Sequence, residues 1–167
     1  YATTYTGLDS IDGGDGTDTL NLASTTAIAD VSGVTVANIE TINLRSVTTT
    51  DFDTSTGFTG LTTLNSTLGT TVALEAAATT DVNVFNSVNT ATVTGGKDVT
   101  ITHTTAGVVT AVGTAGALDI TTAVGAVVVG GGAAATNALG TVTVAMTGVL
   151  TANTGTIDID GGTTIDV

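Results

Sequence analysis

Short stretches in which apolar and polar residues alternate recur along the chain. Ile42 and Leu44 alternate with threonine and asparagine, and Val82 and Val84 alternate with aspartate and asparagine. Apolar side chains at every second position lie on one face of a β-strand, so each stretch predicts a strand buried on one side. The predicted strands span 18–22, 39–44, 81–85, 91–94, 99–102, 118–121, 142–144 and 157–160. Helical character is confined to 74–79, where a glutamate and three alanines favour a helical turn.

The centres of these strands follow one another at short, regular intervals. Val84, Val93, Ile101 and Val109 are separated by 8 or 9 residues. Two strands and two turns then form a unit of about 18 to 22 residues, which is the size of one rung of a solenoid. The chain has no proline and only 3% aromatic residues, so the large side chains that fill a sandwich core are scarce. We predict an all-β, right-handed parallel β-helix or β-roll, with a β-sandwich as the alternative.

The charge is strongly negative and is carried by aspartate. Aspartate and glutamate number 15 against 2 lysine and arginine residues, which gives a formal net charge of −13. Only Glu40 and Glu75 are glutamates, and aspartate is typical of turns and calcium loops. Self-repulsion of this kind opposes a compact fold unless cations offset it. Nucleic acids and anionic membranes require basic patches and are not expected as partners, and no apolar run predicts membrane insertion.

Glycine and aspartate form a specific motif near the start of the chain. Residues 13–21 read G-G-D-G-T-D-T-L-N, which fits the pattern G-G-x-G-x-D-x-U-x with U an apolar residue, and residues 7–12 fit its second half in phase. Calcium takes roughly six to eight oxygen ligands, and glycine allows the backbone to turn carbonyl oxygens toward one point. The motif therefore predicts a calcium site. Its candidate residues are Gly7, Asp9, Asp12, Gly13, Gly14, Asp15, Gly16 and Asp18.

Asp9 and Asp18 are the expected carboxylate ligands of this site. One full and one partial copy of the motif do not make two complete turns, so further ligands would come from upstream residues or from Asp30, Asn38, Asp51 or Asp53. A weaker candidate closes the chain, where Asp158 and Asp160 lie on one face of a predicted strand and repel each other. The alternative interpretation of each acidic segment is a solvated turn or edge without an ion.

The motif and the residues after it resemble a known family. Residues 34–44 read V-T-V-A-N-I-E-T-I-N-L, and together with the glycine-rich turn they are similar to RTX-type surface-layer proteins and large adhesins of Gram-negative bacteria. The resemblance implies type I secretion, calcium-dependent folding outside the cell, and homotypic contacts in a surface lattice. It also implies that other parts of the parent protein bind lipopolysaccharide or another surface glycan.

The expected function is a structural module of a secreted, extracellular surface-layer protein. The alternative is an adhesin stalk or an ice-binding solenoid built from threonine rows, such as the Thr-x-Thr units at 92–94 and 100–102. Residues 1–58 are expected to form an RTX-like calcium-binding segment and 59–167 a Thr/Val/Ala-rich solenoid continuous with it, the whole being a fragment of a longer protein.

Enzymatic function is not expected. His103 is the sole histidine, and without cysteine it forms no familiar zinc cluster. Its position in an alternating segment predicts a surface strand residue. Polysaccharide lyases need basic groups to stabilise an anionic substrate and abstract a proton, and Arg45 and Lys97 are the only two available.

Overall fold

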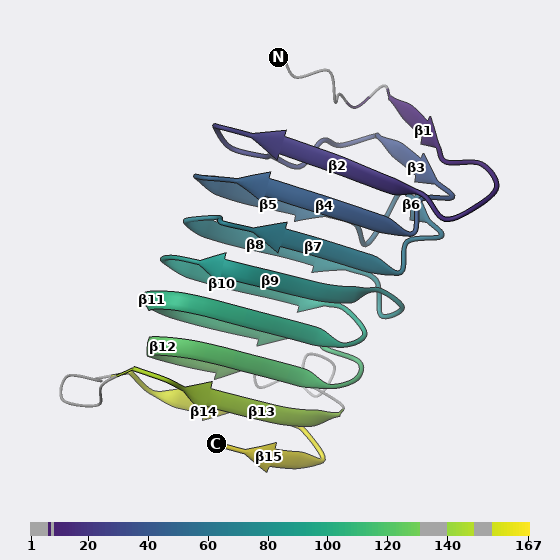
Figure 1. Ribbon diagram of the computed structural model, residues 1–167. Coiled ribbons are helices and arrows are strands. Elements are labelled where there is room, and N and C mark those ends of the chain that lie inside the picture. Colours follow the sequence, from purple (N-terminus) through teal and green to yellow (C-terminus); the bar gives the residue numbers. More distant parts are fainter. Residues whose placement is uncertain (1–6, 8, 131–139, 149–154) are drawn as a thin grey trace.

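The computed structural model describes residues 7, 9–130, 140–148 and 155–167, and within them the chain forms β-strands and no helix (Figure 1). The strands are β1 (Ser10–Asp12), β2 (Thr19–Ser24), β3 (Thr35–Ala37), β4 (Thr41–Ser46), β5 (Thr49–Asp53), β6 (Phe58–Thr59), β7 (Thr63–Thr67), β8 (Thr71–Ala76), β9 (Asp81–Ser87), β10 (Thr90–Gly95), β11 (Val99–Val112), β12 (Leu118–Val129), β13 (Thr141–Met146), β14 (Ile157–Ile159) and β15 (Thr164–Asp166).

These strands stack in parallel as a β-solenoid, which confirms the predicted fold class. One sheet, which we call the front sheet, follows the order β2, β4, β7, β9, β11, β12, β13, β15. The back sheet follows β5, β8, β10, the second halves of β11 and β12, and then β14. Figure 1 shows the two sheets lying one behind the other, with successive turns from β4 to β14 adding a strand to each.

The rungs vary in length but keep the side chains in register. Partners in the front sheet are 22 residues apart at Leu20 and Ile42 and 17 residues apart at Val84 and Ile101. Most of this variation is taken up by the turns, because the inward apolar positions must stay aligned if the core is to remain continuous.

The core is a set of columns in which each apolar side chain lies on the equivalent one of the next rung. Every member of the first front-sheet column between β4 and β13 is at most 1% exposed. These residues are Ile42, Leu64, Val82, Val99, Leu118 and Val142. Small and medium aliphatic side chains suffice because the space between the sheets is thin, which accounts for the scarcity of aromatic residues.

In the described residues, a third, smaller sheet is found at the N-terminal end. It contains β1, β3 and β6, and its last strand ends at Thr59. The first turns are therefore three-sided, and the later ones have two sheets. The front sheet runs through both parts without a break, and the proposed division of the chain at residue 58 stays a prediction.

The helical turn predicted for 74–79 is wrong. Leu74 lies inside β8, 1% exposed, with Phe52 and Val93 as its register partners in the neighbouring strands. Burial of Leu74 between two rungs and parallel hydrogen bonding along both sides of β8 outweigh the weak local helix propensity of Glu75 and the alanines. The chain leaves the strand after Ala76 and turns before Thr80.

Four asparagines form a ladder on the outward face of the front sheet. The Nδ2 group of Asn43 donates to Oδ1 of Asn21 at 2.8 Å, that of Asn65 to Asn43 at 2.8 Å, and that of Asn83 to Asn65 at 2.9 Å. Parallel, in-register strands place equivalent side chains about 4.8 Å apart, which lets each amide act as donor and acceptor at once.

Candidate functional site

The glycine-rich turn at 13–18 connects β1 of the third sheet to β2 of the front sheet. Gly14 and Gly16 have φ angles of 80° and 127°, which side chains rarely allow. Gly13 donates its backbone N–H to the carbonyl of Ala37 at 3.0 Å, and a Cβ at Gly13 would lie 2.0 Å from the carbonyl oxygen of Asn38. The motif glycines are therefore needed both for the path of the turn and for its close contact with Ala37 and Asn38 of the next turn.

Asp12 orders the entrance of this turn. Its Oδ1 atom accepts hydrogen bonds from Asn38 Nδ2 at 2.8 Å and from the backbone N–H of Gly14 at 3.0 Å. The hydrogen bond from Asn38, and secondarily that from Gly14, hold the pKa of the exposed Asp12 carboxyl below its usual value. Asp12 is therefore a charged, structurally engaged residue of the turn.

Asp18 closes the turn and pairs with Glu40 of the next rung. Its backbone N–H donates to Oε2 of Glu40 at 2.7 Å, and its carbonyl accepts from the N–H groups of Glu40 and Thr41, each at 3.2 Å. Its Oδ2 atom is buried and has no hydrogen-bond partner among the described residues. A buried carboxylate oxygen without a partner is costly, so this position favours a cation.

The column of acidic side chains formed by Asp18 and Glu40 does not continue into the next rung. The next residue in the same column is Thr62, whose Oγ1 donates to the carbonyl of Glu40 at 3.0 Å. Within the described part of the chain, no three histidine, cysteine or acidic side chains form a group that could hold a metal ion. The acidic pair thus offers carboxylate ligands from two residues, and the other ligands of an ion would be carbonyl oxygens or solvent.

The remaining motif residues lie around the turn without adding carboxylates to the pair. Gly7 packs against the backbone of Ser32, and the carbonyl of Asp9 accepts the N–H of Thr35 at 3.1 Å. Asp15 is exposed at the tip of the turn. Glu40 was missed by the sequence analysis. The sequence does contain a sign of it: Glu40 follows Asp18 by 22 residues, the same separation as between the paired Leu20 and Ile42.

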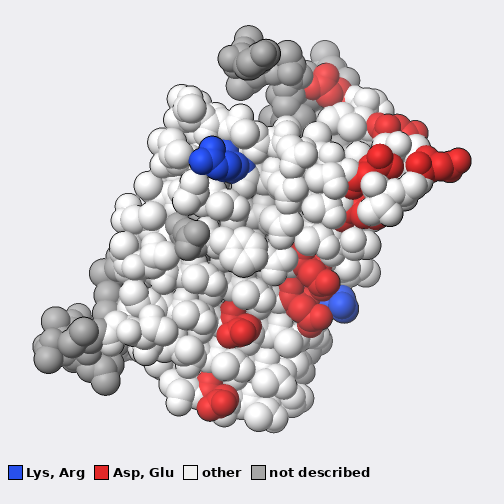
Figure 2. All heavy atoms as spheres, in the orientation of Figure 1, with Lys and Arg blue, Asp and Glu red and all other residues white. Residues whose placement is uncertain are grey.

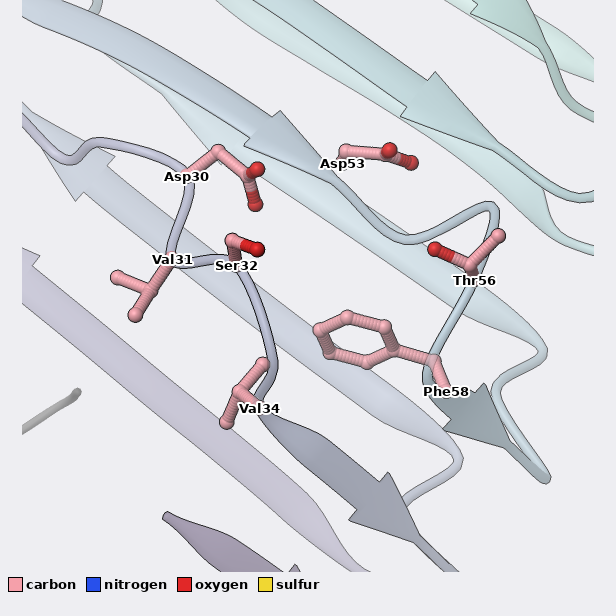
Figure 3. A pocket seen from close by; sticks show the side chains of 7 residues that line it. All are labelled: Asp30, Val31, Ser32, Val34, Asp53, Thr56 and Phe58. Carbon is pink, nitrogen blue, oxygen red and sulfur yellow. The ribbon is translucent and has the colours of Figure 1, made fainter. Parts of the chain in front are cut away.

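The weaker candidates lie elsewhere on the solenoid. Asp51 and Asp158 belong to one outward column of the back sheet, at opposite ends of it, and Asp160 follows β14. Asp30 and Asp53 line a separate shallow hollow with Val31, Ser32, Val34, Thr56 and Phe58 (Figure 3). There, Oδ1 of Asp53 accepts the N–H of Ser55 at 2.7 Å. Of the suggested additional ligands, only Asn38 meets the glycine-rich turn.

The prediction that His103 is a surface residue is wrong. It is 2% exposed, its Nδ1 atom lies 2.8 Å from Oγ of Ser87, and its Nε2 atom is buried without a partner among the described residues. Burial lowers the pKa of His103 from the ordinary value of 6.5. It lies in β11 two residues after the buried Ile101, so the alternation of the strand itself places its side chain inward, in register with Ser87 and Thr122, which are also buried.

The Thr-x-Thr units at 92–94 and 100–102 lie on different sheets. The first belongs to β10 of the back sheet and the second to the front-sheet half of β11. On the back sheet the register partners of Thr90 and Thr94 in β11 are Val108 and Val112. These units therefore do not combine into one regular threonine array.

Comparison with known proteins returned no matching family model, curated protein or solved structure. Fold and site define the class: an acidic parallel β-solenoid with a glycine-rich turn and one in-register carboxylate pair at its three-sided end. Among its described residues, no helix has the length and apolar character needed to cross a membrane.

Proposed function

We propose that the chain is a structural module of a secreted bacterial surface-layer protein and that calcium stabilises its glycine-rich turn. The observation that carries the proposal is the buried Oδ2 of Asp18, which has no hydrogen-bond partner in the described part of the chain and belongs to a residue in register with Glu40. Asp18 and Glu40 would hold the ion. When bound, calcium supplies positive charge between two carboxylates that otherwise repel each other.

The rest of the molecule agrees with a structural role outside the cell. A net charge of −13 makes the fold sensitive to cations, and millimolar extracellular calcium is sufficient for a weak site. The stacked parallel rungs form a stiff body with outward faces that are repetitive, which suits homotypic contacts in a lattice. An adhesin stalk would use the same properties. The ice-binding alternative is disfavoured by the separation of the Thr-x-Thr units on two sheets.

Thermal unfolding with millimolar calcium or with EDTA tests the calcium part. A ligand at 100 times its dissociation constant adds about 2.7 kcal/mol of stability. For a chain of this size that corresponds to a rise in Tm of about 5 to 10 °C. Asp18→Asn should lose this rise. Asp119→Asn is the matched control, because Asp119 is an exposed acid on the outward face of the same sheet and should leave the rise intact.

Two results would contradict the calcium proposal. One is an unchanged Tm between calcium and EDTA, and the other is an equal loss of the calcium effect in Asp18→Asn and Asp119→Asn, which would indicate general charge screening. The assembly part is tested separately by electron microscopy of the protein with calcium, in which ordered sheets are expected. Dispersed particles at every protein concentration would count against a lattice role.

A further inference from the structure

The outward surface of β4, β7 and β9 carries a group of side chains unlike the rest of the protein, which we call the amide–aromatic patch. It consists of Asn43, Arg45, Asn65, Thr67, Asn83 and Phe85. Strand register arranges these residues in two adjacent columns, one of three asparagines and one of Arg45, Thr67 and Phe85. The patch is thus a flat, two-column surface across three rungs.

Phe85 is the apolar element of the patch. It is 40% exposed, whereas Phe52 is 1% exposed and packs edge-on against Phe58 with ring centroids 5.8 Å apart. Its register partners on either side are Thr67 and Thr102, which are short enough to leave the ring accessible. An aromatic ring kept on a sheet face, in a chain with few aromatic residues, is a candidate contact surface.

The asparagines are held in place before any ligand arrives. Asn65 is bonded on both sides, to Asn43 and to Asn83. Each amide has two N–H donors and two acceptor lone pairs, so the ladder leaves one donor and one acceptor per residue for a ligand. Fixed polar groups reduce the entropy cost of binding.

The charges near the patch favour hydroxyl groups over anions. Lys97 is engaged by Asp81 and Asp98 at 3.3 and 3.2 Å, whereas the exposed Arg45 has no ion pair within the described residues. The patch contains no carboxylate. Figure 2 shows acidic side chains along one edge of this face and further acidic groups on its lower part. By register, Asp119 continues the asparagine column beyond Asn83 and Thr100. The net charge of −13 also repels polyanions from the molecule as a whole.

We propose that the amide–aromatic patch binds a neutral polysaccharide. A pyranose ring presents its C–H groups to the face of Phe85, while the asparagine amides and the guanidinium of Arg45 hydrogen-bond its hydroxyls. Rungs about 4.8 Å apart repeat the asparagine amides along the solenoid axis, so a sugar chain running along that axis can contact successive rungs. The inference is independent of the calcium site, because it uses a different part of the front sheet.

Affinity electrophoresis of the whole chain tests this, in gels that contain dextran, amylose, hydroxyethyl cellulose or galactomannan, or the acidic polymers alginate or polygalacturonate. We expect retardation by at least one neutral polymer and by neither acidic one. Phe85→Ala should weaken that binding about tenfold or more, which is about 1.4 kcal/mol. Val108→Ala is the matched control, because Val108 is 42% exposed on the opposite sheet, and it should change affinity less than twofold.

A thermal melt of each variant shows whether it is folded. If Phe85→Ala proves unstable, Thr67→Lys, which places a long side chain beside the ring, serves as the second variant and should also abolish retardation. Retardation by none of the four neutral polymers overturns the proposal. So does retardation by the acidic polymers alone, unchanged binding by a folded patch variant, or an equal loss in Val108→Ala.

Discussion

The asparagine ladder makes a quantitative prediction, because its members differ in how many ladder hydrogen bonds they form. Asn65 takes part in two, of 2.8 and 2.9 Å, and Asn21 takes part in one. A net contribution of about 0.5 to 1.5 kcal/mol per hydrogen bond predicts that Asn65→Ala costs about 1 to 3 kcal/mol and Asn21→Ala about half as much. The loss for Asn65→Ala should lie toward the upper end of its range, because Asn65 is half-buried whereas Asn21 is exposed.

Urea unfolding monitored by circular dichroism gives both values, provided that each variant unfolds in one transition with an unchanged m-value. Asn65→Asp separates the two bonds, because a carboxylate still accepts from Asn83 but no longer donates to Asn43; it should fall between wild type and Asn65→Ala. Equal losses for Asn65→Ala and Asn21→Ala, or a loss below about 0.5 kcal/mol for Asn65→Ala, would refute the idea that the ladder stabilises the front sheet.

Three further substitutions test a core column, a glycine inside β12 and the buried histidine. Ile120→Ala, in a column between Ile101 and Val144 and 0% exposed, should cost about 2 to 5 kcal/mol in urea unfolding, whereas Ile165→Ala, 50% exposed, should cost well under half of that. Gly125→Ala should destabilise more than Gly113→Ala. Both glycines have positive φ, at 124° and 74°, but only a Cβ at Gly125 would lie within 3 Å of backbone, 2.0 Å from the carbonyl oxygen of Gly107. Burial lowers the pKa of His103 in the folded protein below the ordinary value of 6.5. As the pH falls, the unfolded chain therefore binds the proton before the folded one does. The stability that the neutral His103 contributes should be fully present above pH 6.5 and should decline below it. His103→Gln should flatten that part of a stability-versus-pH curve, and an unchanged slope would contradict the assignment.

The sequence was sufficient to predict the solenoid, because alternation and spacing both survive in the fold. The predicted strands at 81–85 and 91–94 lie within β9 and β10, in different sheets and adjacent along the chain. The third sheet at the N-terminal end was not foreseen, since β1, β3 and β6 have only two or three residues each and carry too little alternation to be recognised.

The partners of individual side chains could not be predicted in the same way. Pairing of Asp18 with Glu40 depends on the length of the intervening rung, which varies along the chain and is set by turns that leave no periodic signal. The burial of His103 follows from its place two residues after the buried Ile101, but its polar character predicts a surface residue. Sequence periodicity reports which face of a strand is buried, and it does not report which side chains of neighbouring rungs meet.

Parallel, in-register stacking places like residues on like residues, and the outcome depends on their chemistry. Asparagines in such a column satisfy one another, as the ladder from Asn21 to Asn83 does. Carboxylates in the same arrangement repel and need a cation. Asp81 and Asp98, which precede the paired Val82 and Val99, have Lys97 between them. The pair of Asp18 and Glu40 lies one position earlier along the front-sheet strands. It has no basic side chain in contact within the described residues and leaves a buried oxygen without a partner. The difference between these two acidic pairs is the strongest physical reason to place a divalent cation at the glycine-rich turn.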